Sequence, residues 1–346
     1  MANNLIMGAL RANARSFSLS AKKIEELPRC VTRLICISSL HLNNNLLFDL
    51  PIELQALQQL AELNLGNNNF LDIPVVLKHL PALKKLYLYG NKLKTLPEDI
   101  LEALPNLTLL NVNHNQIKVI PPQIKSLQKL EVLSMVGNEL EFVPDELCCC
   151  VSLTELNLTS NRVTSLPALL GSLFNLKKLY LARNDLYDLP EGISGCHKLK
   201  ILDVGGNHIT MFPTDLRYLC LEELLCEGNF FVQPELLKSH QEMEVLTLKE
   251  LAARQVLLEK IDKWSAVNRS LPLYPELANM LSQVGRCAVC HKPFLTTWLE
   301  CVHFLDLKKE MGMKRKLTVP VRAVLCSYTC FNEGGHDYYG IASVVQ

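Results

Sequence analysis

The chain has 346 residues and a formal net charge of zero, with 35 basic and 35 acidic side chains. Apolar residues make up 49% of it and aromatic residues only 6%, so aliphatic side chains must fill a large core. The balanced charge argues against a nucleic-acid-binding protein, and no apolar run approaches the roughly 20 residues that a membrane-spanning helix needs.

Residues 1–28 are expected to form an N-terminal cap and a partial repeat. The start of the chain has a short apolar segment with no basic stretch before it, so we expect no signal peptide. A cytoplasmic location follows as an expectation, with the nucleus also open, and the 13 cysteines should then be reduced. The consecutive Cys148, Cys149 and Cys150 are expected to be small core residues.

A repeated pattern dominates residues 29–234. The segments LKKLYLYGNKLKTLP, LTELNLTSNRVTSLP and LKKLYLARNDLYDLP are clean copies of L-x-x-L-x-L-x-x-N-x-L-x-x-L-P, and its asparagine recurs at steps of 22–24 residues. One repeat cannot bury its own apolar face but a stack can, so the period predicts a solenoid. The recurring asparagines are Asn45, Asn68, Asn91, Asn115, Asn138, Asn161, Asn184, Asn207 and Asn229.

This pattern resembles the leucine-rich-repeat family, in the short form common inside cells. The resemblance covers about residues 17–234 and implies an α/β solenoid, a horseshoe of about nine repeats with a parallel β-sheet on its concave side. Each L-x-L segment should form a short strand with inward leucines. The asparagine should turn the chain and bond the backbone of neighbouring turns.

The concave sheet is the usual binding surface of this architecture. Tyrosine and arginine side chains, and an apolar centre with a polar rim, are typical of protein interfaces. We therefore predict that a protein substrate binds there, although some of these side chains could simply cover the sheet. The predicted contact residues are Tyr87, Tyr89, Leu109, Asn111, Val132, Ser134, Val136, Asn157, Tyr180 and Arg183.

No catalytic residue is predicted. The chain lacks a glycine-rich phosphate loop, a G-x-S-x-G elbow and an H-E-x-x-H helix. His41 and His114 have no evident nucleophile beside them and are expected to be interface or solvated residues. The chain is therefore expected to be a non-catalytic binding protein.

The leucine period changes in residues 235–283. Apolar residues at three- and four-residue spacing, among strong helix formers, predict a helix from about Leu248. Thr247 is the predicted N-cap, and Glu250 is expected to complete a capping box with it. The simplest interpretation is a helix that caps the solenoid.

The segment TLKELAARQV, residues 247–256, also resembles the elongin-binding box of SOCS-box and von Hippel-Lindau-type proteins. Thr247, Leu248, Ala252 and Val256 occupy the positions of that box, with Ala252 in place of the commoner cysteine. The resemblance implies binding to elongin B/C by an amphipathic helix that inserts a leucine into a hydrophobic groove.

The segment SLPLYPELANML, residues 270–281, resembles the cullin-selecting box that follows in the same family. Leu271, Pro272, Leu273 and Pro275 match its Leu-Pro-aliphatic-Pro core, with Tyr274 as an extra residue. The resemblance implies a cullin of type 2 or 5 and leaves open which one. Without the resemblance, the segment reads as a proline-bounded turn followed by a short helix.

Residues 284–346 carry two cysteine pairs, separated by 35 residues. The sequence between them is rich in β-formers, which suggests a knuckle, a hairpin and then a second pair at a helix N-terminus. Two such pairs in a reducing compartment favour one structural, tetrahedral zinc over a redox site or buried free thiols. The predicted ligands are Cys287, Cys290, Cys326 and Cys330.

Several residues are alternative ligands. His291 and His336 could replace a cysteine or support the site, and Cys301 and His303 are spare candidates. A RING-type module would need about eight ligands for two zinc ions, so this tail should not recruit a conjugating enzyme by itself.

Two functions remain open from the sequence. The first is a substrate-recognition adaptor of an elongin-cullin-RING ubiquitin ligase, with the repeats holding a protein substrate. The second is an intracellular leucine-rich-repeat scaffold without a ligase role. The exposure of Leu248 discriminates between them, because a capping helix would bury its apolar face on the last repeat.

Overall fold

The computed structural model describes residues 6, 9–10, 14–233, 246–262, 264–281, 284–296, 298–315, 317–333 and 338–340. The chain forms two compact units, one of Met1–Ile209 with Tyr218–Phe230 and one of Thr210–Arg217 with Phe231–Gln346. No helix within these described ranges combines the length and the apolar character needed to cross a bilayer.

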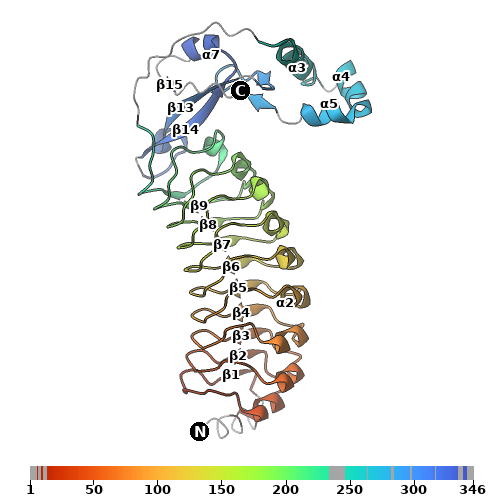
Figure 1. The fold of residues 1–346 in the computed structure, drawn as a ribbon, viewed down its shortest axis with the longest axis vertical. Helices are drawn as coiled ribbons and strands as arrows, with labels where there is room; N and C mark the ends of the chain where they lie inside the picture. The colour runs from red at the N-terminus through yellow and green to blue at the C-terminus, as the bar shows by residue number, and fades with distance from the viewer. Residues whose placement is uncertain are drawn as a thin grey trace. The chain divides into compact units, whose positions relative to one another are not determined.

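The first unit is a solenoid around one parallel sheet, in which every strand pairs with the next along the chain (Figure 1). The register repeats without a slip, with Leu63 opposite Leu86 and Leu86 opposite Leu110. The partial repeat supplies the first of the ten strands, which confirms the predicted leucine-rich-repeat fold. The strands are β1 (Ser16–Ser18), β2 (Ser39–His41), β3 (Glu62–Asn64), β4 (Lys85–Tyr87), β5 (Leu109–Asn111), β6 (Val132–Ser134), β7 (Glu155–Asn157), β8 (Lys178–Tyr180), β9 (Ile201–Asp203) and β10 (Glu223–Leu225).

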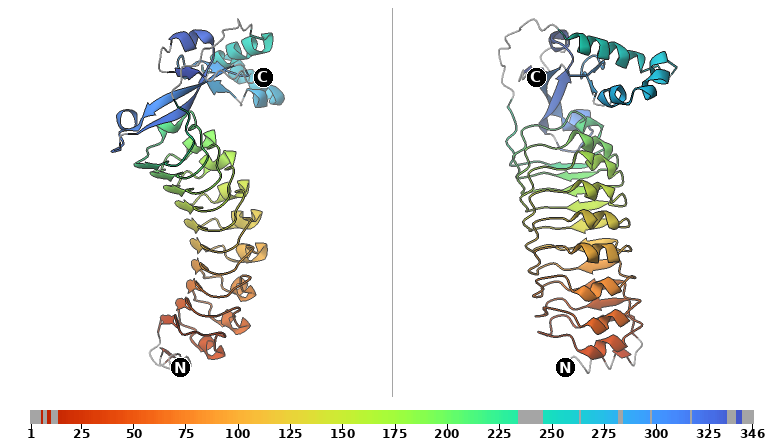
Figure 2. Two further views of the ribbon diagram at one scale, coloured as in Figure 1. Left: turned by 60° about the vertical axis from the view of Figure 1, so that its left-hand side comes forward. Right: turned by 45° about the vertical axis from the view of Figure 1, so that its right-hand side comes forward.

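Short helices lie on the other side of the solenoid from the sheet (Figure 2). The proline that ends each copy of the pattern directly precedes most of them, because its fixed φ holds the chain extended until the turn begins. The helices are η1 (Arg29–Arg33), η2 (Ile52–Ala56), η3 (Val75–His79), α2 (Glu98–Ala103), η4 (Pro122–Ser126), η5 (Asp145–Cys149), η6 (Ala168–Ser172), η7 (Glu191–Gly195) and η8 (Leu216–Tyr218).

One repeat differs in the type of its helix. Between Asn91 and Asn115 the step is 24 residues, where the neighbouring steps are 23, and this repeat contains α2. An α-helical turn uses 3.6 residues against three in the tighter 3₁₀ form. The extra residue is therefore accommodated by a wider turn on the outer side, while the strand register continues unchanged.

A ladder of buried asparagines runs along the solenoid, as predicted. At Asn161, for example, Nδ2 donates to the carbonyls of Leu158 and Met135, both at 2.9 Å, and Oδ1 accepts from the Leu140 N–H at 3.1 Å. Each such side chain satisfies three backbone groups that would otherwise be buried without a partner. Asn229, in the last repeat, makes equivalent bonds but is only partly buried.

The cysteine triplet is only partly as expected. Cys148 and Cys150 are buried, and burial raises their pKa values to about 11 and about 12. Cys149, between them, is exposed, so its predicted core position is wrong. Cys148 and Cys149 end η5 and Cys150 is its C-cap, and successive residues of a helical turn cannot all face the same side.

The second unit combines helices with a small antiparallel sheet. In that sheet β13 pairs with β14 over their whole length and with β15 on its other edge. The elements are α3 (Leu248–Glu259), α4 (Ala266–Ser270), η9 (Leu271–Leu273), α5 (Pro275–Met280), β11 (Gly285–Arg286), β12 (Pro293–Phe294), β13 (Leu299–Asp306), α6 (Leu307–Glu310), β14 (Thr318–Leu325), α7 (Tyr328–Glu333) and β15 (Tyr338–Gly340).

Candidate functional site

The predicted contact residues of the concave face lie on or directly after strands β4 to β8. They alternate with buried leucines, so that Tyr87 stands partly exposed between the buried Leu86 and Leu88. All ten predicted residues are partly or fully exposed. The sheet therefore presents them together, which is the condition for a common binding surface.

Tyr87 and Tyr89 are placed differently on this face. The ring of Tyr89 lies against Gly66, where an added Cβ would come within 2.3 Å of Tyr89 Cζ. Only glycine leaves room for the ring to lie flat on the neighbouring repeat. Partial burial and the carboxylate of Glu62 raise the pKa of the Tyr87 hydroxyl, which therefore stays protonated at neutral pH. Tyr89 is thus a rigid aromatic surface, and Tyr87 is a hydrogen-bonding group beside it.

The residue before each ladder asparagine adopts a left-handed backbone conformation. Glycine or asparagine fills this place in most repeats, but Ser160 (φ 58°), His114 (φ 54°) and Arg183 (φ 57°) do so without that conformational freedom. The ring of His114 lies over Gly137, where a Cβ would meet its Nδ1 at 2.6 Å. The side chains of His114 and Arg183 are exposed next to the concave sheet. Such positions are enriched at binding sites, which puts His114 beside the predicted Arg183 as a candidate contact.

The helix α3 has one face packed within its own unit and one face free. Ala253 and Leu257 join a buried cluster with Leu271, Leu281 and Leu295. Leu248 on the opposite face is 85% exposed, Leu251 is 49% exposed, and Ala252 is also exposed. Val256, the fourth residue of the predicted box, packs partly against the buried cluster. Leu248 and Ala252 are therefore available to a partner, whereas Val256 is only partly so.

The N-terminus of α3 confirms half of the predicted capping box. Thr247 Oγ1 accepts a hydrogen bond from the Glu250 N–H at 3.2 Å, as an N-cap should. The Glu250 side chain does not serve the box and is completely buried. It accepts from Arg254 Nε (2.6 Å), the Leu295 N–H (3.0 Å) and both donors of Thr296 (2.7 and 2.9 Å). The tertiary partners are favoured because the Leu295 N–H, in the loop after β12, would otherwise be buried without an acceptor.

Sequence reasoning missed this carboxylate as the connection between α3 and the strand-rich part of the unit. No local sequence pattern predicts this contact, because Thr296 lies 46 residues from Glu250 in the sequence. Burial alone would raise the pKa of Glu250, but the guanidinium of Arg254 and the donors of Thr296 and Leu295 lower it on balance. The helix is therefore held by an ionised group.

The second predicted box forms a turn and a short helix, η9 and α5. Leu271 is buried, whereas Pro272, Leu273 and Pro275 are exposed, Leu273 to 75%. Nearby, Trp264 is 86% exposed, and sequence reasoning did not single it out. Exposed apolar side chains thus continue from α3 to α5, and such continuity is typical of an interaction surface.

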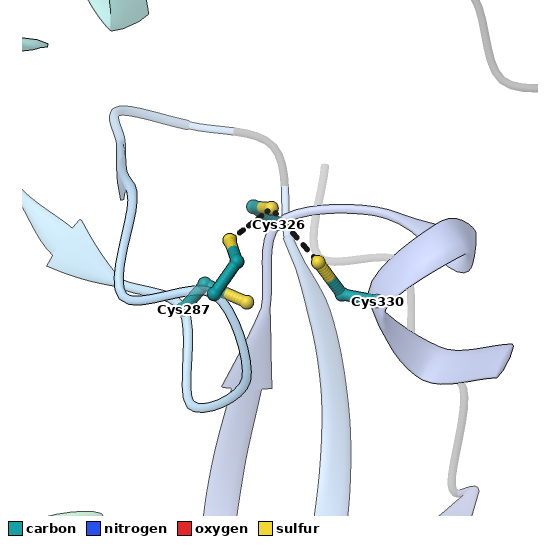
Figure 3. A group of neighbouring side chains, drawn as sticks. Cys287, Cys326 and Cys330 are labelled. Carbon is teal, nitrogen blue, oxygen red and sulfur yellow. Dashed lines mark hydrogen bonds between the residues drawn. The ribbon is translucent and has the colours of Figure 1, made fainter. Parts of the chain in front are cut away.

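The four predicted ligand cysteines come together at one place in the second unit (Figure 3). Cys287 and Cys290 lie in the turn after β11, Cys326 directly follows β14, and Cys330 lies in α7. Their sulfur atoms all lie within 4.8 Å of one another. The Cys290–Cys326 and Cys326–Cys330 sulfur separations are 3.5 and 3.6 Å.

These separations suit a metal and exclude a disulfide. Four sulfurs in a tetrahedron around zinc at about 2.3 Å lie about 3.8 Å apart, whereas disulfide sulfurs lie about 2.0 Å apart. Although burial alone would raise it, the backbone N–H groups of Cys290, Cys326 and Val289 lower the pKa of Cys287 to about 7. Burial and the neighbouring thiols raise the pKa of Cys326. A cation would favour the thiolate form of all four groups.

The alternative ligands that the structure describes, His291, Cys301 and His303, are not part of this cluster. His291 is exposed, and Cys301 is buried beside the four cysteines without belonging to the set that could share one ion. His303 Nε2 lies 3.8 Å from a carboxylate oxygen of Glu310. His336 lies outside the described residues.

Comparisons with known proteins match the repeats. A model of the leucine-rich-repeat family, "Leucine rich repeat", matches residues 35–93, 81–140, 105–163 and 151–209. Leucine-rich repeat-containing protein 69 from Xenopus laevis is 43% identical over 123 residues, which are 35% of this chain and 36% of that protein. The same protein from Mus musculus is 38% identical over 125 residues, which are 36% of each chain. The matched region thus spans about a third of the length of these curated relatives.

Solved structures resemble the solenoid as well. A plant peptide hormone receptor, RGFR1 in complex with RGF2, has a TM-score of 0.52 at 26% identity and covers 59% of this chain and 34% of its own. The leucine-rich repeat domain of APL1B has a TM-score of 0.52 at 19% identity, and the match covers 66% of this chain and 72% of that one. The second likeness concerns the fold alone.

Proposed function

This chain belongs to the leucine-rich-repeat family, and from that premise we propose that it is the substrate-recognition adaptor of an elongin-cullin-RING ubiquitin ligase. Its repeats are a protein-binding scaffold of a typically non-catalytic kind. The comparisons themselves give no indication of a ligase role. The proposal therefore depends on residues 247–281 and on their geometry.

The observation that carries the proposal is the free face of α3. A helix that only filled its own unit would bury its leucines, yet Leu248 is 85% exposed while Leu257, nine residues later, is 5% exposed. An exposed leucine near the start of a helix suits insertion into a hydrophobic groove, the mode by which an elongin box binds. Ala252 lies one helical turn after Leu248 on the same face, so the two residues can enter one groove together.

The exposed residues of η9 and α5 would bind the cullin. Pro272, Leu273 and Pro275 keep their side chains in solvent, so the Leu-Pro-aliphatic-Pro segment is free for a partner. Leu271 holds the turn in place by its burial in the same cluster as Leu257. Tyr274, which is 59% exposed, is an extra residue in this motif. The motif therefore does not distinguish a cullin of type 2 from one of type 5, and experiment must decide between them.

The concave face would hold the substrate protein. Its rigid Tyr89 and the apolar Leu109, Val132 and Val136 lie on neighbouring repeats, and polar residues surround them. Aromatic and aliphatic anchors within a polar rim are where interfaces concentrate their binding energy. The adaptor would act by proximity, because it raises the effective concentration of substrate beside the conjugating enzyme.

One structural zinc would be bound by Cys287, Cys290, Cys326 and Cys330. It would join the turn after β11 to β14 and α7, which are distant in sequence but share the four sulfurs. The four-cysteine set leaves no open position on a tetrahedral ion, which suits a structural role and not a catalytic one. In sequence, this tail resembles that of leucine-rich repeat-containing protein 58, and a cytoplasmic location fits four reduced thiols.

Affinity purification from cells tests the ligase proposal. The wild-type chain should recover elongin B, elongin C and a cullin, and Leu248→Asp with Ala252→Phe should abolish that recovery without lowering the yield of folded protein. Lys249→Glu, exposed on the same helix turn, is the matched control and should retain both partners. Absence of elongin and cullin, or their retention by the double variant, would leave the scaffold alternative in place.

A further inference from the structure

The second unit contains a pocket of about 330 Å³ that the proposed functions do not use. Leu257 of α3, Leu281 just after α5, and Pro293 of β12 line its interior, and all three are buried. Its size is at the lower end of the range typical of ligand pockets. An apolar interior of this size suits one large apolar side chain.

The rim of this pocket is basic. Lys260 at the end of α3, Arg286 in β11 and the His291 side chain line it together with the apolar residues. No acidic residue is found among the described residues that line the pocket. Glu259 and Asp262 lie near it in the sequence but do not line it, and Asp262 Oδ1 accepts a hydrogen bond from the Trp264 N–H at 2.9 Å. The rim therefore offers charge complementarity to carboxylates.

His291 is held at this rim by an unusual backbone conformation. Its φ is 58°, a region in which glycine is free of strain and a histidine is not. The turn is closed by the His291 N–H, which donates to the Cys287 carbonyl at 3.0 Å, and by the Cys287 N–H, which donates to the Lys292 carbonyl at 3.0 Å. Glycine would adopt this conformation at a lower cost, and residues with such backbone strain cluster at binding sites.

We propose that this pocket binds an acidic peptide segment of a partner protein that inserts one large apolar side chain. The apolar side chain would fill the interior against Leu257 and Leu281, and carboxylates on either side of it would meet Lys260 and Arg286. The pocket faces the side of α3 that carries Leu257, opposite Leu248. The proposal is therefore independent of elongin binding and stands if the ligase proposal fails.

A selection from a library of short, displayed peptides tests this directly. The bait is the full chain purified with zinc. The enriched peptides should combine an aromatic or aliphatic residue with flanking aspartates or glutamates. The best one, made with a fluorescent label, should bind saturably by anisotropy. Arg286→Glu and Lys260→Glu should each weaken binding roughly tenfold or more, as expected for the reversal of one charge in a close pair.

Three further variants make the result specific. Ile261→Ser, which removes an exposed apolar residue that lines the pocket, should also weaken binding, whereas Leu248→Asp on the opposite face should leave it unchanged. His291→Gly should weaken binding while the melting temperature holds or rises. Zinc content and melting temperature, measured for every variant, separate lost binding from lost folding. Failure to enrich any sequence, enrichment of basic peptides, or unchanged affinity in Arg286→Glu would overturn the proposal.

Discussion

At the scale of single residues, buried polar side chains stabilise both units by forming hydrogen bonds with backbone groups of other segments. Asn161 does so within the solenoid, where its side chain bonds the Leu158 carbonyl of its own repeat and the Met135 carbonyl and Leu140 N–H of the preceding repeat. Glu250 does so in the second unit, where it bonds two backbone N–H groups across 45 and 46 residues. Removal of either side chain would leave buried donors or acceptors without partners, which costs more than the bond itself contributes.

Asn161→Ala should lower the free energy of unfolding of the solenoid by roughly 2–4 kcal/mol, because two carbonyls and one N–H lose their partners in the interior. Urea unfolding followed by far-ultraviolet circular dichroism measures this loss. Asn157→Ala in the same repeat is the matched control, since Asn157 is partly exposed and its Oδ1 accepts only from Thr159 N–H. A similar loss for both variants would contradict the role given to the ladder.

Glu250→Gln should destabilise the second unit by about 2–3 kcal/mol at neutral pH, because charge-assisted bonds to Arg254, Leu295 and Thr296 are weakened. The folded state lowers the pKa of Glu250 below its ordinary value of 4.5, so its contribution is complete above that pH. The contribution disappears as pH falls through the folded pKa. The difference between wild type and variant should therefore shrink below about pH 4.5.

Tryptophan fluorescence during urea unfolding measures this difference for the second unit alone. The chain has two tryptophans, Trp264 and Trp298, and both belong to that unit. A gap between wild type and Glu250→Gln that stayed constant from pH 7 to pH 3.5 would show that the charge of the carboxylate does not matter.

The elements differ in how far the sequence could predict them. Each repeat carries its own strand, turn and asparagine within about 23 residues, so the period alone identified the strands and the ladder. The Thr247 N-cap was predictable for the same local reason, and the four-cysteine cluster followed from pair spacing. The burial and hydrogen bonding of the Glu250 side chain were not predictable, because its backbone partners lie in a turn more than 40 residues away.

The sequence also could not predict which face of the helix α3 is buried. Its apolar residues occur almost all around it, so the sequence could not tell which leucines pack internally and which are free. The structure divides them, with Leu257 buried and Leu258 38% exposed. The part of the predicted elongin box that can reach a partner therefore depends on tertiary packing and not on the motif.

Leu257→Ala should destabilise the second unit by about 2–4 kcal/mol, because it opens a cavity in the cluster with Leu271 and Leu281. Leu258→Ala, the same substitution at the next position of the same helix, should cost less than about 1 kcal/mol. Urea unfolding followed by tryptophan fluorescence gives both values. Equal losses would show that α3 does not pack on its unit through the face described.

At the scale of the whole molecule, the two units have different sources of stability. The solenoid gains from each repeat stacked on the next, with leucines and asparagines in register from β1 to β10. The second unit has a small sheet and short helices, and four sulfurs from distant segments meet at one point in it. A metal ion shared by such distant segments would add directly to the stability of this unit.

Removal of zinc should therefore unfold parts of the second unit while the solenoid stays protected. In hydrogen exchange, a strong chelator should accelerate exchange in the turn after β11, in the end of β14 and in α7, with β3 to β7 unchanged. These segments would share the ion through their cysteines, and a bound structural metal contributes directly to folding. The tryptophan fluorescence midpoint in urea should fall in parallel.

Two cysteine variants separate the metal site from ordinary core packing. Cys326→Ala should lose the metal and reproduce the exchange pattern of the chelated protein, whereas Cys301→Ala, buried nearby but outside the four-sulfur set, should keep one zinc per chain. Metal analysis of each purified protein gives the stoichiometry. If the wild type carried far less than one zinc, or if the chelator left exchange in α7 unchanged, the four sulfurs would be a cluster of buried thiols. The stability of the second unit would then depend on the Glu250 network and the leucine cluster alone.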